Sequence, residues 1–405
     1  MLRFHSGGSG RAYGGVGAFR LLGCSVNNRT PRSWLNTLFL LGTLVLTLIL
    51  VPLKLALQGL RWSEVVVFLA MYTATGLAIT VGYHRLFSHR AFQAAWPLRL
   101  AVLLLGAAAF QNSALAWCSD HRHHHRFVDD PERDPYPVRR GFWYAHWLWV
   151  MEGGARPFDG VADLLRDPLL RWQRRYHFWI GGVVAALPVL VAGWATGNLA
   201  GQLIMGLLLR IVLTHHSTFL INSAAHWFGS QPYTDANSAR DNALLAPFTF
   251  GEGYHNFHHM WQWDYRNGPH WYQWDPAKWL IAAGAWVGLT RGLRRVAATE
   301  MQRARVAMEA KRLAARLARA LPADALQAKT ALEAAHARLD AALTAFQGCL
   351  DAWRVKKAGW RQKGQAKAEA WRVARAEWKA QRARHRRDLR EAWTAWKQAR
   401  RQAAA

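Results

Sequence analysis

Long apolar runs separated by short polar segments dominate the first half of the chain. Four runs are long enough to cross the ~30 Å hydrocarbon core of a bilayer as helices, and they are Leu35–Leu53, Val65–Tyr83, Phe178–Thr196 and Leu199–Ile221. Within them the one charged residue is Arg210. Because a charge in lipid is costly, we expect Arg210 to face protein or a water-filled cavity. The pattern predicts an integral membrane protein with four transmembrane helices.

A fifth run, Leu98–Trp117, is weaker than the other four. Arg99 lies near its start, Gln111 and Asn112 interrupt it, and only Leu100–Phe110 is fully apolar. A stretch this short is more typical of an interfacial or buried helix than of a spanning one. We therefore expect that this segment does not cross the membrane.

Histidines gather in three clusters beside the apolar runs, with the sequences HRLFSH, HRHHH and HNFHH. In the second and third clusters the spacing i, i+3, i+4 places three imidazoles on one face of a helix. The two histidines of the first cluster are five residues apart and need a bend to approach each other. His226, at the end of the last run, can reach the same centre. The candidate metal ligands are His84, His89, His121, His124, His125, His226, His255, His258 and His259.

The density of these histidines favours metal binding over a solvated surface. An isolated histidine is usually a surface or hydrogen-bonded core residue, and His123, which points away from the shared helix face, fits that description. Neutral imidazole binds zinc, copper, iron and nickel. Nine nitrogen ligands are too many for one ion, so two ions are expected, and a redox-active pair could activate dioxygen whereas zinc alone could not. Acidic neighbours that could orient the ring N–H groups are Asp120, Asp129, Asp130 and Glu252.

All ligands of one metal centre must meet on one side of the membrane. The first cluster follows the second run, the second follows the weak segment and the third follows the last run. The clusters share a side only if Leu98–Trp117 does not cross. The same side carries the arginine-rich polar segments and the tail, so the positive-inside rule identifies it as the cytoplasm.

Composition separates the membrane part from the C-terminal tail. The chain has 405 residues, 52% of them hydrophobic, and a formal net charge of +27. From Arg291 onward 28 Lys and Arg stand against 10 Asp and Glu, so two thirds of the excess charge belongs to the tail. Such charge is usually solvated, and nucleic-acid binding is not expected. The three cysteines are far apart and predict neither a disulfide framework nor a zinc ribbon.

The tail has a strongly helical composition, and Pro322 is expected to divide it into a short helix and a long one. In the long helix apolar residues recur every seven positions at Leu332, Leu339, Phe346, Trp353 and Trp360. This spacing is typical of a coiled coil, through self-association or with a partner. A helix lying on anionic lipid is the second interpretation.

The expected fold class is all-α, with four transmembrane helices, a cytoplasmic helical cap that carries the histidine-rich two-metal site, and a long C-terminal amphipathic or coiled-coil helix. The expected parts are a disordered basic leader at 1–32, a membrane domain at 33–297 and a basic Trp-rich helical tail at 298–405. The leader lacks the apolar core and cleavage site of a signal peptide.

The motifs HRLFSH, DHRHHHRF, NSAAHWFG and GEGYHNFHH, in this order, resemble the histidine boxes of the membrane acyl-CoA desaturases of the stearoyl type. The likeness extends through QNSALAW and RRGFWYAH and covers roughly Leu60 to Arg295. The stretch DYRNGPHWYQWDPAKWL is similar to the bacterial branch. The resemblance implies a di-iron centre held by the nine histidines and, through a water molecule, by Asn222.

The resemblance also implies a kinked tunnel that holds the acyl chain across the irons. Gln111, Trp117 and Thr218 match positions near that tunnel, and Arg139 and Arg140 match a basic pair near the entrance for the acyl carrier. Two departures from the family pattern concern neighbouring positions. His123 replaces a small residue inside the second box, and Ser113 stands where the animal enzymes carry Asp.

The implied reaction converts a CH₂–CH₂ pair of a saturated fatty acyl thioester into a cis double bond, with consumption of O₂ and two electrons. The chain has no GxGxxG strand-to-helix element and no CxxCH motif. We therefore expect no bound NAD or flavin, and electrons from a ferredoxin-like or small haem protein on the cytoplasmic face of a bacterial inner membrane. The alternatives are a hydroxylase on the same scaffold and a desaturase of lipid-bound acyl chains; a metal transporter would need more polar spans.

Overall fold

The computed structural model describes residues 32–152, 158–319, 323–362 and 368–404. The predicted leader therefore lies outside the described residues, except for Arg32, which forms a backbone bridge with Glu152. Within the described ranges nearly every element is a helix. Two short strands, β1 (Gln93–Ala94) and β2 (Thr290–Arg291), pair antiparallel. The predicted all-α fold class is confirmed.

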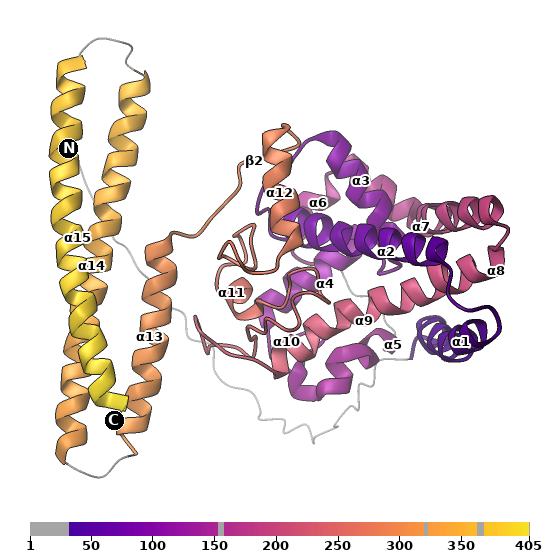
Figure 1. Ribbon diagram of the computed structural model, residues 1–405, viewed down its shortest axis with the longest axis horizontal. Helices are drawn as coiled ribbons and strands as arrows, with labels where there is room; N and C mark the ends of the chain where they lie inside the picture. Colours follow the sequence, from indigo (N-terminus) through magenta and orange to yellow (C-terminus); the bar gives the residue numbers. More distant parts are fainter. Residues whose placement is uncertain (1–31, 153–157, 320–322, 363–367, 405) are drawn as a thin grey trace, which may run out of the picture.

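Among the described residues, four helices are long and apolar enough to cross a membrane, and each contains one of the predicted runs. They are α1 (Trp34–Gln58); α2 (Trp62–Leu77) with the π-helix η1 (Ala78–Ser88); α7 (Pro168–Thr196); and α8 (Leu199–Gln202), η4 (Leu203–Leu209), α9 (Arg210–Asn222) and α10 (Ala224–Trp227) in succession. Large apolar side chains such as Trp179 and Trp194 lie exposed on their outer faces, as lipid contact requires. In Figure 1 the axes of the last three are roughly aligned, with α7 leading away from the cap and α9 returning to it, whereas α1 is seen nearly end-on.

Helices α3 (Trp96–Ala107) and α4 (Ala114–Phe127) form a re-entrant hairpin between the membrane helices. The end of α3 lies against Gly181, near the middle of α7, where a Cβ atom would come within 2.6 Å of the carbonyl oxygen of Ala107. Helix α4 then carries the chain back to the cap. As expected for a segment that does not cross, Leu98–Trp117 contains no helix long enough to span a membrane. The segment is packed inside the protein rather than at the interface.

The cap consists of short helices and loops at one end of the membrane helices (Figure 1). Besides α4 it contains η2 (Val138–Arg140), η3 (Tyr144–Leu148), α5 (Trp149–Met151), α6 (Ala162–Leu165), α11 (His255–Met260) and α12 (Pro276–Trp286). A buried apolar cluster joins it to the membrane helices through Tyr83 of η1, Leu103 of α3, Leu115 of α4, Leu170 of α7 and Ile281 of α12. This cluster fixes η1 and α4, which carry the first two histidine boxes.

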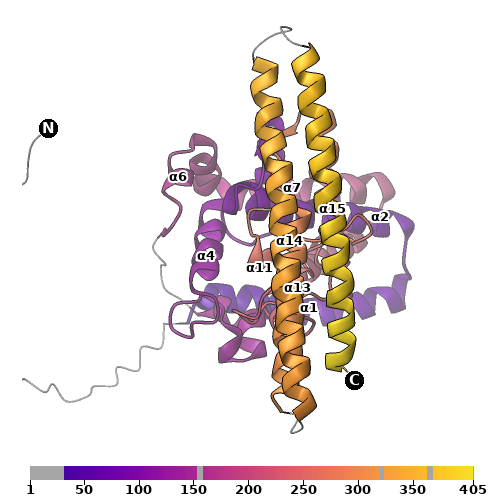
Figure 2. The same ribbon diagram turned by 90° about the vertical axis from the view of Figure 1, so that its left-hand side faces the viewer.

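The tail is a bundle of three helices, α13 (Ala298–Leu317), α14 (Ala323–Gln362) and α15 (Ala368–Ala404). Pro322 lies outside the described residues, but α13 ends before it and α14 begins after it, as the predicted break requires. The single long helix predicted beyond it is wrong. Two helices, α14 and α15, are described there instead, and their apolar stripes pack on each other around Leu339, Leu343 and Trp396. The stripe is thus buried within the chain, and Figure 2 shows α14 and α15 side by side.

Helix α13 attaches the bundle to the cap. Its residues Met301 and Ala304 pack against an apolar cluster that includes Phe257 of α11 and Trp261. The Lys311 ammonium lies 2.6 Å from a carboxylate oxygen of Asp235. The cap therefore lies between the bundle and the membrane helices, as Figure 1 shows.

Candidate metal centre and apolar cavity

The first histidine box lies at the end of the π-helix η1. In a π-helix the backbone hydrogen bonds join residues five apart, and the N–H of His89 accordingly donates to the carbonyl of His84 at 3.1 Å. The two imidazoles stand on one side, with ring centroids 4.8 Å apart. The expected bend is therefore a widened helical turn, which brings residues at i and i+5 together.

The second box lies in α4, whose N-terminus is capped by the side chain of Ser113. His121 and His125, one helical turn apart, point to the same place as the first box, and His124 points to a neighbouring place. His123 lies outside both groups, half-exposed, with its Nδ1 atom 3.4 Å from Asp159. The expectation that His123 points away from the ligands is confirmed.

The third box forms the short helix α11, and its division mirrors that of α4. His258 joins the group of the first box, whereas His255 and His259 join His124 and the His226 of α10. The five-histidine set comprises His84, His89, His121, His125 and His258, and the four-histidine set comprises His124, His226, His255 and His259. Within each set the candidate ligand atoms lie within 4.8 Å of one another.

The separations of the ring nitrogens fit metal coordination. The Nε2 atom of His258 lies 3.0 Å from the Nε2 atoms of both His84 and His125. A single ring nitrogen carries either one proton or one lone pair, so it cannot satisfy both neighbours by hydrogen bonds. Two nitrogens bound about 2.1 Å from one ion stand about 3 Å apart when they subtend a right angle. The Nε2 atoms of His124 and His226 are buried without a protein partner among the described residues, as free ligands would be.

Burial keeps six of these imidazoles neutral. Burial, with the neighbouring imidazoles, holds the pKa of His89, His121, His125, His258 and His259 well below the usual range. The pKa of His255 falls to about 3 for the same reason. A neutral imidazole presents a lone pair to a cation, so these six rings are ready to bind metal at neutral pH.

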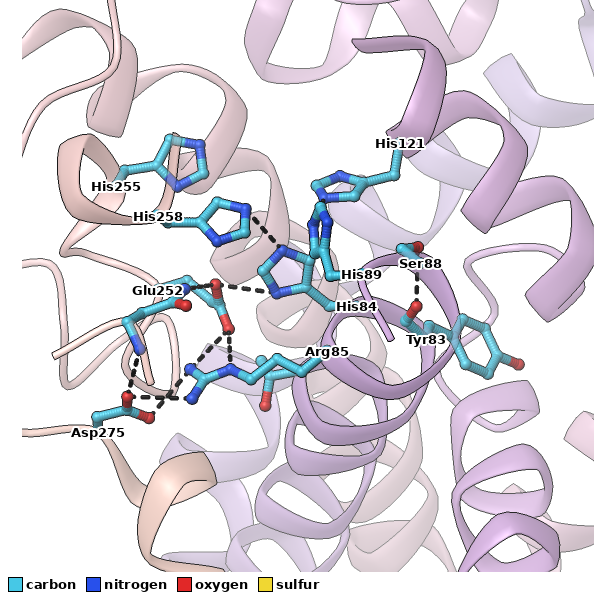
Figure 3. Close-up of polar contacts among 12 residues, drawn as sticks. Tyr83, His84, Arg85, Ser88, His89, His121, Glu252, His255, His258 and Asp275 are labelled. Carbon is cyan, nitrogen blue, oxygen red and sulfur yellow. Dashed lines mark hydrogen bonds and ion pairs between the residues drawn. The ribbon is translucent and has the colours of Figure 1, made fainter. Parts of the chain in front are cut away.

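Carboxylates and a hydroxyl orient several of the rings from behind. Glu252 lies 3.1 Å from the Nδ1 atom of His84 (Figure 3), and Asp134 lies 2.9 Å from that of His124. The Nδ1 atom of His226 lies 2.7 Å from the hydroxyl of Ser238, which donates to Asp129. Contacts of this kind fix the tautomer and direction of a ligand ring.

Of the four acidic residues expected to orient the histidine rings, two do so in the described contacts. Glu252 contacts a ligand ring directly and Asp129 contacts one through Ser238, but Asp130 pairs with Arg133 instead. Asp120 lies on the wall of the adjacent cavity. Asp134 was missed because it follows the box by nine residues and reaches His124 only through a loop that turns back.

Two arginines inside the boxes hold the boxes in place. Arg85, which follows His84, is buried and donates to Glu252 and Asp275, as Figure 3 shows. Burial alone would raise the pKa of Glu252, but His84 and Arg85 outweigh it and lower the pKa to about 2. Arg122 donates to the carbonyls of Phe87 and Ser88 and to Asp163. The sequence singles out neither arginine beyond its place in a box.

An apolar cavity of about 720 Å³ reaches the metal centre from between the membrane helices and the cap. Its wall includes Ile79, Phe110 and Phe250, and also the metal-ligand candidates His84, His121 and His255. This volume falls within the range of about 300–1,000 Å³ that is typical of small-molecule sites. Because rings of both histidine sets form part of its wall, a molecule in the cavity lies beside both.

The proposed substrate residues fall into two groups. Gln111, Trp117 and Thr218 line the cavity, and the Gln111 amide donates to the Thr218 hydroxyl at 2.8 Å. Arg139 and Arg140 are exposed on η2 and lie outside the described wall. Arg140 donates to Glu152, which does line the cavity, at 2.8 Å. The role of the arginine pair at an entrance remains a prediction.

Asn222 ends α9 four residues before His226 and lines the cavity. Its predicted contact with a metal through water remains a prediction. Nearby, His146 accepts from His216 at 2.9 Å and donates to the hydroxyl of Ser223, which itself donates to Phe219. These two histidines form a separate pair outside the metal sets.

The fold and site define a class: a membrane protein with two adjoining polyhistidine sites beside an apolar cavity. The chain belongs to the fatty acid desaturase family, whose sequence pattern matches residues 60–290, more than half of the chain.

Curated relatives of this family share about a third or more of the aligned residues. Acyl-CoA desaturase 1 of Saccharomyces cerevisiae is 37% identical over 288 residues, which cover 69% of this chain and 55% of the relative. A probable acyl-CoA desaturase of Schizosaccharomyces pombe is 41% identical over 246 residues, or 60% of this chain and 51% of the relative. Stearoyl-CoA desaturase 5 of Bos taurus is 35% identical over 276 residues, or 65% and 79%. The chain spans about half the length of the two fungal relatives.

Proposed function

We propose that the protein is an oxidoreductase that introduces a cis double bond into a saturated fatty acyl-CoA with a pair of histidine-held iron ions. The observation that carries the proposal is the apolar cavity whose wall includes His84, His121 and His255. An acyl chain in that cavity would lie along the metal centre. The names of the relatives, acyl-CoA and stearoyl-CoA desaturases, support the choice of an acyl thioester.

The five-histidine set would hold one ion, and the four-histidine set, with Asn222 through water, the other. Bound there, an iron pair would supply the oxidising chemistry that removal of hydrogen from an unactivated CH₂–CH₂ pair requires, with O₂ and two electrons. Trp117 stacks on His121 with ring centroids 4.8 Å apart. That contact ties the wall of the cavity to a ligand ring, so the position of the acyl chain is fixed relative to the centre.

The electrons would come from a separate carrier, a ferredoxin-like or small haem protein. The absence of a nicotinamide- or flavin-binding motif from the sequence supports this proposal. We infer a bacterial inner membrane as the location, with the metal centre and both termini in the cytoplasm. The cap and the strongly basic tail lie at the same end of the membrane helices, and the positive-inside rule places such charge in the cytoplasm.

The direct test combines metal analysis with product analysis. The full chain, purified from iron-supplied cells, should contain about two iron ions per chain, because nine imidazoles exceed the ligands of one ion. Given stearoyl-CoA, O₂ and a reduced ferredoxin, it should yield a cis-monounsaturated acyl-CoA detectable by mass spectrometry. A control without O₂ should yield none.

The same assay separates the alternatives. A hydroxylated acyl chain as the main product would indicate that the protein is a hydroxylase. Conversion of phospholipid acyl chains while added acyl-CoA stays saturated would favour a lipid-bound substrate. Iron-loaded, folded protein that alters neither substrate would contradict the proposal.

A further inference from the structure

Arg210 lies near the middle of the fourth membrane helix and is completely buried. Its Nη1 atom donates to the carbonyl oxygen of Ala108 at 2.6 Å. Its Nε and Nη2 atoms are buried without an acceptor among the described residues, and no described salt bridge involves it. A charge at that depth costs several kcal/mol, so the reason for this arginine must be sought at Ala108.

Ala108 ends α3 inside the protein. The last carbonyls of a helix have no intrahelical partner and carry a partial negative charge, and at membrane depth water is not freely available to satisfy them. His215 of α9 places its Nε2 atom 2.9 Å from the carbonyl of Ala109 and 3.2 Å from that of Phe110. Because a carbonyl only accepts, this nitrogen is the donor. Helix α9 thus supplies donors to three consecutive carbonyls.

The turn held in this way is strained. Phe110 has a positive φ angle of 54°, a conformation that a bulky residue adopts only where the surroundings impose it. Asn112 also has a positive φ angle, 75°, which asparagine tolerates more readily. The adjoining residue Gln111 is also tied to α9, through Thr218. Three positions of one rigid helix therefore fix the turn at residues 108–112.

The same turn is a wall of the apolar cavity. Phe110, Gln111 and Asn112 all line it, and so do Ala107 before the turn and Ser113 after it. Arg210 and His215 differ in this respect, because Arg210 lies behind the wall whereas His215 also contributes to its lining. Displacement of the turn would therefore change the cavity next to the metal-binding histidines.

We propose that Arg210 and His215 are positioning residues that hold the turn at 108–112 against α9. The position of this turn then determines which carbons of a bound acyl chain lie beside the metal centre. The specificity part of this inference rests on the proposed desaturase function, whereas the holding of the turn does not. Arg210 acts through Ala108, so it shapes selectivity without touching substrate.

The test compares Arg210→Met and Arg210→Lys with a matched control, Gln202→Met. Gln202 lies on the same membrane helix, is equally buried and has both amide atoms unpartnered among the described residues. His215→Leu removes the second donor. The full-length variants would be purified in lipid nanodiscs and measured for hydrogen exchange of residues 108–112, for iron content, and for products from an equimolar mixture of myristoyl-, palmitoyl- and stearoyl-CoA.

Arg210→Met and His215→Leu should exchange faster in the turn and retain iron. The ratio of products that differ in chain length, or of products that differ in double-bond position, should change by about tenfold. This is the discrimination that an apolar pocket gives per methylene group. Arg210→Lys keeps a donor for Ala108 and should resemble wild type, as should Gln202→Met.

Wild-type exchange and product ratios in both Arg210→Met and His215→Leu would overturn the proposal. An equal change in Gln202→Met would overturn it as well, because loss of any buried polar group would then suffice. If Arg210→Met does not insert, the pair His215→Leu and Arg210→Lys decides by hydrogen exchange of the turn, because His215 also lines the cavity and could alter the products directly. A wild-type protein without desaturase products would refute the proposed function, while hydrogen exchange would still test the holding of the turn.

Discussion

His124 and His258 occupy equivalent places in two different helices, since each is the one ring of its box that serves the other metal set. Replacing either by Ala leaves one set a ligand short, and a metal site that loses a ligand loses affinity. We expect iron to fall from about two ions per chain to about one or fewer, with loss of turnover. Elemental analysis of the purified protein measures this.

His123→Ala is the matched control, because His123 is the neighbour of His124 on the same helix but faces Asp159. It should keep full iron content and activity. Equal iron in wild type and in both ligand variants would show that the sets are assigned wrongly. Loss of iron in the control alone would place His123 in the centre.

The ligand residues were predictable because histidine is rare enough that its density carries information. Which ring serves which set was not, because the spacing i, i+3, i+4 gives one shared face and the division depends on how α4 and α11 meet. The residues behind the rings were only partly predictable. Asp134 and Ser238 reach His124 and His226 through loops, and no local pattern encodes that approach.

The buried carboxyl of Asp241 destabilises the folded state when it is charged. Burial raises the pKa of its carboxyl to about 7, although the backbone N–H groups of Phe257 and Asn256 and the charge of Arg305 lower it. In the unfolded chain the pKa of this carboxyl is about 3.9. The proton bound in the folded state therefore makes its full contribution to stability below about pH 4, and this contribution is lost as the pH rises through 7. Asp241→Asn keeps an acceptor for Phe257 and has no charge to lose.

Thermal unfolding should therefore separate Asp241→Asn from wild type in a pH-dependent way. At pH 4 the two midpoints should differ little, and at pH 8 the variant should melt at least about 2 °C higher, since roughly 1 kcal/mol shifts the midpoint of a domain of this size by 2–4 °C. A difference that is constant from pH 4 to pH 8 would show that the carboxyl does not titrate in this range.

At the scale of elements, Arg85 joins the π-helix η1 to the loops around α11 and α12. It is buried and pairs with Glu252 and Asp275. Removal of one member of a buried ion pair costs about 3–5 kcal/mol because the partner charge stays buried. Arg85→Met should therefore lower the unfolding midpoint by roughly 10 °C, as measured by tryptophan fluorescence in nanodiscs.

Arg90→Met provides the comparison, because Arg90 lies just beyond the same helix and its side chain is exposed where it pairs with the half-buried Asp163. Exposed pairs contribute about 0–1 kcal/mol, so its midpoint should stay within about 3 °C of wild type. Similar losses in the two variants would mean that burial of the Arg85 pair is not what holds the box.

The membrane helices were predictable because hydrophobic length alone determines what a bilayer accepts. Two element-scale features escaped prediction. The π-helix at Ala78–Ser88 has no apolar period of its own, so the sequence indicated only that His84 and His89 needed a bend. The arrangement of the tail was not predicted for a different reason. An apolar stripe can be buried by a second chain or by a helix of the same chain, and the spacing of its residues does not distinguish the two.

On the scale of the whole molecule, the tail is a separate layer beyond the cap rather than part of the metal centre. Its three helices bury their own core around Leu339 and Trp396, and α13 is the helix that contacts the cap. The family pattern matches residues 60–290 and ends before α13 begins. The metal sets and the cavity wall likewise lie within residues 33–297, which supports the proposed division into a membrane domain and a tail.

Deletion of residues 302–405 should therefore leave iron binding and desaturation at half or more of the full-length level. The truncated protein keeps the nine histidines, the cavity wall and the cluster of Tyr233, Phe257, Trp261 and Val296, but loses the cover that Ala304 gives that cluster. It should unfold a few degrees lower, because exposure of apolar surface costs about 25 cal/mol per Å². The double variant Lys311→Ala, Arg312→Ala, which cuts the polar contacts of α13 to Asp235 and Gln231 while keeping the tail, is the comparison. A folded truncated protein that binds no iron would show that the tail holds α11 in place and belongs to the catalytic unit.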